Sequence, residues 1–458
     1  MKTLKLSYYT IPIKLSKEDK LILVHGYTGA IDVVSSKLYA AISTSKGNIE
    51  IVSDELKEKL ISRGYLTIQA KEEEIKYMKD MIKSKIRSES HQTLDVTWVV
   101  TYNCNFRCPY CFETNTSKNK TSPVTFSKEM IDKAYKAIDL YKEEYHIKKK
   151  TSMVLFGGEP LLKQNKNIVD YIVNEGNKRG YTFSAVTNGY ELDSFTDLIG
   201  SDKINKLQIT LDGTKTMHDK RRFHYSDGGT FDKIIKNIQT IKDKEIRIGI
   251  RMNVDKDGIT EFSNLNRFLN NVGLLDNKNI TIQAAKLMKH NDVDLSKRKD
   301  IEIPSMREYI DMHKRHNTIN KCKDYDVKSR FLYAIKNNKP FPFRTSSCAI
   351  TKGGVVLDPL GYIYPCWELV GKKDYIIGNY LLGNFVMNEK SEKWHNAFLL
   401  NDEKCMKCKF ALICGGGCPK RNKEERKQNC MLFQNIFKIS IENGYYEIQG
   451  KSLKYNNF

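Results

Sequence analysis

From Thr93 onward, short apolar runs alternate with longer segments in which apolar residues recur every three or four positions. The short runs predict β-strands, and the longer segments predict amphipathic helices. Six of the short runs are expected to be strands: residues 94–101, 152–158, 182–189, 206–213, 246–255 and 280–287. This alternation is typical of parallel strands joined by right-handed crossovers, so we expect an α/β fold. Because six units are too few to close an eight-stranded barrel, residues 93–290 predict a partial (β/α)6 barrel.

Residues 1–92 have a different pattern, and we expect them to form a separate N-terminal module. Two predicted strands are followed by two predicted helices, at residues 5–13, 21–29, 30–42 and 53–66. Strands followed by two short helices indicate a winged-helix-like module. The charged stretch 71–89 has apolar residues at helical spacing and predicts a connecting helix.

The chain changes character twice more after the predicted barrel. Residues 291–345 are charged and predict a mostly helical bridge. Residues 346–440 are rich in cysteine, glycine and short apolar runs, which predicts a further domain, and residues 441–458 are expected to be a C-terminal tail.

The composition is that of a globular chain with excess positive charge. Its 458 residues are 40% hydrophobic and 29% charged, which is ordinary for globular proteins. No apolar run could span a bilayer, and the first residues lack the apolar core of a secretion signal. We therefore expect a cytoplasmic protein without a membrane partner. The net charge of +21 favours acidic partners, but no recognised nucleic-acid module accompanies it, so we do not expect a nucleic acid as the partner.

The most specific chemical signal is a loop after the first predicted barrel strand. Cys104, Cys108 and Cys111 have the spacing C-x3-C-x2-C. A tetrahedral zinc site or an ordinary iron–sulfur cube uses four protein ligands. Three thiolates without a fourth nearby would leave one iron of a cube open to a small molecule, which makes the cluster a potential catalyst. A structural metal site with a distant fourth ligand, or three buried cysteines, are the alternatives.

Glycines and polar residues also follow the next predicted strands. The second strand ends in a four-residue segment, Gly157, Gly158, Glu159 and Pro160. Asn188 follows the third strand and Asp212 follows the fourth. Since sites in parallel α/β folds gather at the carboxyl ends of the strands, we expect these residues near the cysteine loop.

Seven further cysteines lie in the C-terminal region: Cys348, Cys366, Cys405, Cys408, Cys414, Cys418 and Cys430. In a reducing compartment, metal ligation is the better interpretation than disulfide bonding. A zinc ribbon would use four cysteines and leave three unexplained. Two iron–sulfur clusters would use all seven if one cluster lacks a ligand. Cys322, which stands alone upstream, is either an ordinary buried cysteine or that missing ligand.

Both cysteine sets and the Gly157–Pro160 segment together resemble the radical S-adenosylmethionine (SAM) enzymes that carry a SPASM auxiliary-cluster domain. The resemblance covers about residues 93–432. It implies that the cysteines of the first loop hold a catalytic [4Fe–4S] cluster whose open iron chelates SAM. It also implies that the Gly157–Pro160 segment receives the SAM amino group. Thr210 and Arg251 match positions that contact the SAM ribose and carboxylate, although ordinary strand-end polar residues are an alternative.

The same resemblance implies two auxiliary [4Fe–4S] clusters, and therefore three clusters in all. One would be held by Cys405, Cys408, Cys414 and Cys430, and the other by Cys348, Cys366 and Cys418. The implied reaction is reductive cleavage of SAM to methionine and a 5′-deoxyadenosyl radical, which removes a hydrogen from the substrate. An external electron donor such as flavodoxin or ferredoxin is the implied redox partner.

Two kinds of substrate fit such an enzyme: a sulfatase and a ribosomally made peptide. Three features of the sequence argue against a sulfatase. Anaerobic sulfatase maturases, which form formylglycine, carry an Asp general base at the position of Trp367 and a Gln at the position of Phe156. Glu368, the next residue, is a candidate base, with a surface role as the alternative. Those enzymes also generally lack a separate N-terminal module.

A maturase of ribosomally made peptides is the favoured interpretation. Residues 1–92 would bind the leader of a precursor peptide by strand addition, or would merely pack against the barrel. A cluster with three cysteine ligands would leave an iron open to a substrate thiolate, which favours a sactionine-like thioether over a carbon–carbon crosslink. If Cys322 completes that cluster, substrate ligation loses its basis. A non-catalytic iron–sulfur or zinc protein that binds nucleic acid is the alternative from another class.

Overall fold

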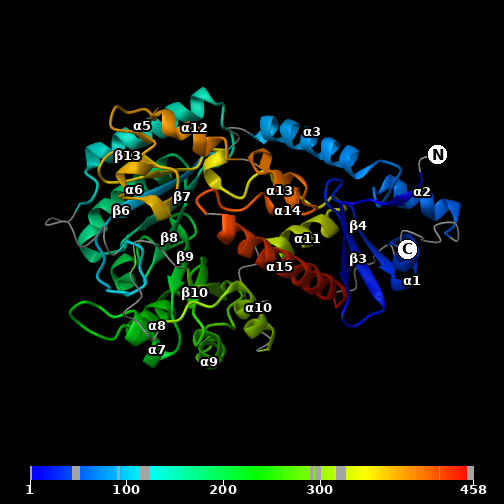
Figure 1. Cartoon of the computed structure of the whole chain (residues 1–458). Helices are drawn as coiled ribbons and strands as arrows, with labels where there is room; N and C mark the ends of the chain where they lie inside the picture. Colours follow the sequence, from blue (N-terminus) through cyan, green and yellow to red (C-terminus); the bar gives the residue numbers. More distant parts are fainter. Residues whose placement is uncertain are drawn as a thin grey trace. The chain divides into compact units, whose positions relative to one another are not determined.

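The computed structural model divides into two compact units, each built from segments that are distant in sequence (Figure 1). The structure describes residues 3–43, 52–89, 93–113, 124–288, 293, 301–315, 326–397, 399–421 and 423–450. The barrel unit contains His91–Lys323 and Ala349–Asn396. The second unit, here called the N/C unit, contains Met1–Ser90, Asp324–Cys348 and Ala397–Phe458. Cys322 lies outside the described residues.

The barrel unit is organised around parallel strands that pair in chain order. These strands are β6 (Asp95–Thr101), β7 (Ser152–Gly157), β8 (Phe183–Thr187), β9 (Ile204–Thr210), β10 (Arg247–Val254) and β11 (Ile280–Lys286). All six predicted strands are therefore confirmed, and β11 forms one edge of the described sheet, so the sheet is open. The prediction of an α/β fold with a partial (β/α)6 barrel is confirmed.

Amphipathic helices connect the strands, as the spacing predicts. They are α5 (Lys128–Glu144), α6 (Lys166–Lys178), α7 (Lys215–Arg221), α8 (Phe231–Ile241), α9 (Gly258–Asn271) and α10 (Met306–Arg315). Helix α5 begins after Ser127, whose Oγ accepts a hydrogen bond from the Met130 backbone N–H at 3.2 Å. Helix α8 buries Ile234, Ile238 and Ile241 on one face, and each buried isoleucine contributes roughly 1.5–3 kcal/mol.

Part of the cysteine-rich region extends the barrel sheet. Strand β12 (Val355–Leu357) pairs in parallel with β6, and antiparallel strands β13 (Tyr362–Tyr364), β14 (Gly378–Asn379) and β15 (Val386–Met387) follow. Helix α12 (Glu389–His395) closes this segment, and the chain from Ala397 onward belongs to the N/C unit. The division differs from the expected separate domain at 346–440, because backbone pairing with β6 ties β12 to the barrel.

The N/C unit contains the strands and helices of residues 1–90. Its sheet consists of antiparallel strands β2 (Thr10–Lys14), β3 (Lys20–His25) and β4 (Ile31–Ser35), and β1 (Lys5–Leu6) pairs separately with β5 (Leu66–Thr67). The helices are α1 (Ser36–Ser43), α2 (Asp54–Ser62) and α3 (Lys71–Glu89), and α3 has the predicted bounds. The helix predicted at 30–42 is wrong in its first half. Ile31, Val33 and Val34 are β-branched and pair with β3 as a strand.

C-terminal segments complete the core of the N/C unit. They contribute α11 (Val327–Lys336), α13 (Glu403–Met406), α14 (Ala411–Cys414) and α15 (Lys423–Gln449). Helix α15 continues past residue 441, where a tail was expected, because Ile441, Tyr445 and Ile448 are buried in the same apolar cluster as Ile22 of β3. Among the described residues, no helix is long and apolar enough to cross a membrane.

We expect Tyr102→Phe to lower the free energy of unfolding of the apo-protein by about 1–3 kcal/mol. The Tyr102 hydroxyl donates to Asp358 Oδ2 at 2.7 Å, and both side chains are almost fully buried. Asp358 also accepts the Tyr362 backbone N–H at 2.8 Å, so this carboxylate joins the end of β6 to the β12–β13 turn. Urea unfolding followed by circular dichroism measures the loss. The exposed Tyr362→Phe is the matched control, and an equal loss in both variants would contradict the prediction.

Candidate active site

The three-cysteine loop follows β6 and is stabilised by local backbone contacts. The Phe106 N–H donates to Cys104 Sγ at 3.3 Å, and the Cys111 N–H donates to the Cys108 carbonyl at 3.2 Å. The Arg107 N–H donates to the Phe223 carbonyl at 3.1 Å, which pairs the loop with the segment after α7.

The environment of the loop disfavours free thiolates. Burial, followed by the nearby charges of Cys108 and Glu159, raises the pKa of Cys104. Burial and then Glu113 raise the pKa of Cys111 to about 12. The cysteines lie close enough to influence one another electrostatically. Three neighbouring thiols therefore ionise together only when a cation compensates their charge, as a metal cluster does.

Gly157 and Gly158 allow the end of β7 to lie directly against the chain that enters the cysteine loop. The Gly158 N–H donates to the Thr101 carbonyl at 2.9 Å, and the next N–H donates to the Asn103 carbonyl at 2.8 Å. A Cβ at Gly157 would lie 2.3 Å from the Thr101 carbonyl oxygen, and one at Gly158 would lie 2.3 Å from that of Asn103. Only glycine therefore fits both positions.

Glu159 connects this segment to the end of the next strand. Its buried carboxylate accepts hydrogen bonds from Thr187 Oγ1 at 2.6 Å, the Asn188 N–H at 2.6 Å and the Leu161 N–H at 3.0 Å. Burial raises the pKa of Glu159 to about 7, although these hydrogen bonds oppose the shift. Asn188 Nδ2 also donates to Asn105 Oδ1 at 2.7 Å, within the cysteine loop. The adjacent Pro160 is also buried. A contact of this segment with SAM stays a prediction.

The structure pairs Thr210, the last residue of β9, with Arg251, which lies three residues before the end of β10. The two residues are direct partners in the strand register. Thr210 is buried, and Arg251 Nε donates to Asn253 Oδ1 at 3.2 Å. Burial lowers the pKa of the Arg251 guanidinium. Their contacts with SAM stay a prediction.

A buried network that the sequence did not predict links the loop to β9. Arg222 Nη1 donates to the Tyr110 hydroxyl at 2.9 Å, and that hydroxyl donates to Asp212 Oδ2. Asp212 Oδ1 accepts the Asn253 N–H at 2.9 Å. Asp212 was noticed because it follows a strand. Arg222 gave no signal, since it is one of 76 basic residues and lies outside any motif.

Two buried polar atoms that lack hydrogen-bond partners bear on whether this site fits a cluster and SAM. Within the described ranges, Arg222 Nε and Glu113 Oε1 have no hydrogen-bond partner. Burial, followed by Glu159, raises the pKa of Glu113 to about 8. A buried N–H without an acceptor costs free energy, so the site suits an anionic or sulfur-rich group beside Arg222. The three thiols, and the close backbone approach that Gly157 and Gly158 allow, agree with a [4Fe–4S] cluster.

The ligands of a single metal ion and those of an iron–sulfur cube are arranged differently. In the part of the chain that the structure describes, no three His, Cys, Asp or Glu side chains form a group that could hold one metal ion. Each thiolate of an iron–sulfur cube binds a different iron, so cube ligands do not converge on one point. Ligation by Cys104, Cys108 and Cys111 is accordingly a proposal.

Four C-terminal cysteines are neighbours within the N/C unit. Cys405 lies on α13, Cys414 ends α14, Cys430 lies on α15, and Cys408 falls between the first two. Burial, then Asp402 and Cys430, raise the pKa of Cys405 to about 12. Burial, with smaller effects of Cys430 and Cys408, raises the pKa of Cys414 to about 11. This proximity agrees with the implied ligand set of one auxiliary cluster.

The other implied set is divided between the units. Cys348 and Cys418 belong to the N/C unit, where the Ser347 N–H donates to the Gly415 carbonyl at 2.9 Å and Ser347 Oγ donates to the Gly417 carbonyl at 2.9 Å. These bonds align the segments that lead to the two cysteines. Cys366 belongs to the barrel unit, so a cluster held by all three stays a prediction.

The two positions that depart from the sulfatase-maturase pattern contact each other. The rings of Phe156 and Trp367 stack with centroids 5.3 Å apart and an interplanar angle of 23°. Trp367 is about half exposed in the barrel unit. Glu368 lies close enough to Arg251 for its charge to oppose the effect of burial on the Arg251 pKa.

We expect Gly158→Ala to reduce the iron and sulfide content of the anaerobically reconstituted protein severalfold. The new Cβ would meet backbone oxygens on the entering chain, so the cysteine loop must shift. Gly249→Ala on β10 is the matched control, because its Cβ would meet its nearest neighbour at 3.8 Å, an ordinary contact. Iron and sulfide assays with absorbance spectra check this. Equal loading of the two variants would show that the close approach is dispensable.

Known proteins resemble this chain over most of its length. The profile of the radical SAM superfamily matches residues 98–268. The chain is 24% identical over 378 residues to the cysteine-type anaerobic sulfatase-maturating enzyme of Clostridium novyi, covering 74% of this chain and 92% of that protein. It is 22% identical over 451 residues to the radical SAM cyclopropyl synthase TigE of Paramaledivibacter caminithermalis, covering 91% and 89%.

A third relative and a solved structure extend the comparison. The subtilosin biosynthesis protein AlbA of Bacillus subtilis is 23% identical over 366 residues, covering 76% of this chain and 73% of that protein. The structure of anSMEcpe with bound AdoMet and the Kp18Cys peptide aligns with 78% of this chain and 99% of its own, with a TM-score of 0.56 and 18% identity, and shares the fold. Residues 98–268 therefore form a radical SAM domain, and this chain is a radical SAM enzyme with a cysteine-rich C-terminal region.

Proposed function

We propose that this enzyme matures a ribosomally made precursor peptide by installing a Cys thioether crosslink. The observation that carries the proposal is the three-cysteine loop fixed against the Gly157–Pro160 segment within the radical SAM domain. Its relatives include a sulfatase-maturating enzyme and a bacteriocin biosynthesis protein, which supports a peptide or protein substrate. The alternative of a non-catalytic nucleic-acid-binding protein has no such support.

The residues of the barrel unit take the following proposed roles. Cys104, Cys108 and Cys111 would hold the cluster, and Arg251 would orient the SAM carboxylate with Thr210 beside it. When bound, the cluster would supply the electron that cleaves SAM to methionine and a 5′-deoxyadenosyl radical. Two auxiliary clusters, at the C-terminal cysteines, would bring the number to three, and an external donor such as flavodoxin or ferredoxin would supply electrons.

The aromatic pair argues for a thioether rather than formylglycine. An indole has one N–H donor and accepts no proton, so Trp367 cannot serve as the general base that the sulfatase pattern places there. Its stacking on Phe156 occupies both positions at which the sulfatase pattern has polar side chains. A cluster held by Cys348, Cys366 and Cys418 would leave one iron for a substrate thiolate, which favours sulfur as the atom joined.

A leader peptide could add to the exposed edge of β4. In the described sheet, β4 is an outer strand. The His25 N–H donates to the Ala30 carbonyl at 2.9 Å, and the Ser36 N–H donates to the Asp19 carbonyl at 3.2 Å. Hydrogen-bonded pairs alternate along antiparallel strands, so Ile31 and Val33 direct their backbone N–H and C=O groups away from β3. An added strand would pair with these groups.

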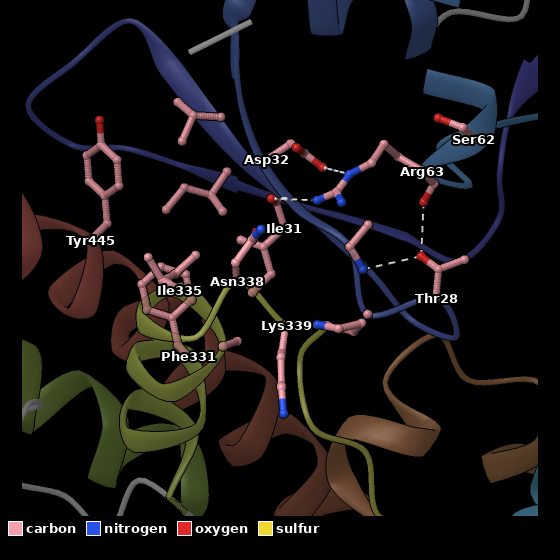
Figure 2. A pocket seen from close by; sticks show the side chains of 16 residues that line it. Thr28, Ile31, Asp32, Ser62, Arg63, Phe331, Ile335, Asn338, Lys339 and Tyr445 are labelled. Carbon is pink, nitrogen blue, oxygen red and sulfur yellow. Dashed lines mark hydrogen bonds and ion pairs between the residues drawn. The ribbon is translucent and has the colours of Figure 1, made fainter. Parts of the chain in front are cut away.

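A cavity of about 520 Å³ lies beside this edge (Figure 2). Phe331 and Ile335 of α11 provide an apolar wall, Lys339 provides positive charge, and Arg63 forms an ion pair with Asp32 of β4 at 2.7 Å. Arg63 Nη2 donates to the Ile31 carbonyl at 3.0 Å, so one outward group is already occupied. An extended leader with alternating apolar and acidic side chains fits this lining and the net charge of +21.

Anaerobic turnover with a Cys-containing precursor tests the proposed product. We expect a mass loss of two hydrogens, retention of sulfur and one thiol that resists alkylation. Cys104→Ala should abolish both 5′-deoxyadenosine and this product, because its loss removes a proposed cluster ligand. Mass spectrometry before and after alkylation distinguishes the outcomes. A crosslink with every thiol alkylated would indicate carbon–carbon bonding, and a product that has lost sulfur would indicate formylglycine.

We expect Val33→Pro to weaken leader binding about tenfold relative to Val33→Ala. Proline removes the outward N–H but leaves the ladder with β3 intact, and one hydrogen bond is worth about 0.5–1.5 kcal/mol. The alanine variant loses side-chain packing and keeps the N–H, so it controls for damage to the core. Fluorescence anisotropy with a labelled leader measures the dissociation constants. Equal affinities of the two variants would refute strand addition at β4.

A further inference from the structure

Arg222 is a buried cation beside the cysteine loop. Its side chain is 9% exposed, and its Nη1 donates to the hydroxyl of Tyr110, a residue of the loop. Its guanidinium carbon lies 5.7 Å from the centroid of the Phe106 ring, also in the loop. Among the described residues, its Nε has no partner. The guanidinium therefore contacts the loop and retains one unused donor.

Ionisable side chains lie near this guanidinium. Cys108, Cys111 and Glu159 each respond to its charge, which lowers their pKa values against the effect of burial. Burial disfavours the charge of Arg222 itself, but Cys108, Tyr110 and Asp212 raise its pKa. Arginine stays protonated in proteins under ordinary conditions. A permanent positive charge thus lies beside the proposed ligands in a site of low dielectric.

The backbone of Arg222 is fixed at the end of α7. Its N–H donates to the His218 carbonyl at 2.7 Å, and its carbonyl accepts from Thr230 Oγ1 at 2.5 Å. The following segment pairs with the cysteine loop, where the Tyr225 N–H donates to the Asn105 carbonyl at 3.0 Å. Because both elements are joined by backbone hydrogen bonds, the guanidinium keeps its place relative to the cysteines.

We propose that Arg222 is a positioning residue that offsets the negative charge of the cysteine-bound cluster and raises its reduction potential. Three thiolates on a [4Fe–4S] cube give a net negative charge, and one-electron reduction increases it. Nearby charge and hydrogen bonds to sulfur are known levers on such potentials. A fixed cation with an unused N–H favours the reduced form. The inference rests on the proposed ligation by Cys104, Cys108 and Cys111.

The test is an EPR-monitored redox titration of the reconstituted holoenzyme. The relevant signal is the one that changes on addition of SAM and is missing from Cys104→Ala. In Arg222→Gln, we expect the ratio of reduced to oxidised cluster at the wild-type midpoint to fall about tenfold, a shift of about 59 mV for a one-electron couple. Arg222→Lys keeps the charge and should restore most of the potential. Arg247→Gln removes an exposed arginine at the first residue of β10, outside the cysteine loop, whose charge water screens, and should leave the potential unchanged.

Each outcome decides the proposal. An unchanged potential in Arg222→Gln would overturn it, as would an Arg222→Lys potential equal to that of Arg222→Gln. If Arg222→Gln binds less iron, Arg222→Lys with wild-type iron content and potential supports the role of the charge. If wild-type protein shows no SAM-dependent signal, the proposed ligation fails instead, which separates that failure from one of the Arg222 inference.

Discussion

The close approach of two backbones at the carboxyl ends of β6 and β7 is the constraint on which the site depends. The N–H groups of Gly158 and Glu159 bond to carbonyls at Thr101 and Asn103, immediately before the first cysteine. No side chain fits between these segments. The start of the cysteine loop is therefore set by backbone hydrogen bonds from a neighbouring parallel strand. Such bonds fix position more tightly than side-chain contacts, which suits a site that must hold reacting groups within small tolerances.

The second requirement of the site is that its buried charged side chains have hydrogen-bond partners. Glu159 lies in a dry interior, where three donors satisfy its carboxylate, and it joins the ends of β7 and β8. Arg222 and Asp212 share the Tyr110 hydroxyl on the other side of the loop. Among the described residues, Arg222 Nε and Glu113 Oε1 are buried and have no hydrogen-bond partner. Natural proteins keep few such atoms, and those at functional sites are usually completed by a ligand.

The sequence predicted the barrel because its strands and helices have strong, regular periodicity. All six strands were found within a few residues, and the strand-end position of Thr210 and the Gly157–Pro160 segment followed from parallel topology. Strand β4 was missed because Ile31–Val34 runs directly into α1, and a short apolar run does not distinguish strand from helix. Arg222 could not be found, since its importance comes from a tertiary contact with Tyr110 across more than a hundred residues.

Enzymes that all begin by cleaving SAM differ in the residues around the reacting groups. In this chain, two aromatic rings stand where the sulfatase pattern has polar side chains. Phe156 ends the strand that carries the glycine pair, and Trp367 follows Cys366 directly. Because the two rings stack, a substitution at one position leaves the other ring without its partner. A single substitution toward the sulfatase pattern therefore costs stacking energy. The two rings place aromatic surface at both positions where the sulfatase pattern has polar side chains. Since an indole accepts no proton, a base near this pair must come from another residue, and Glu368 is the next residue in the chain.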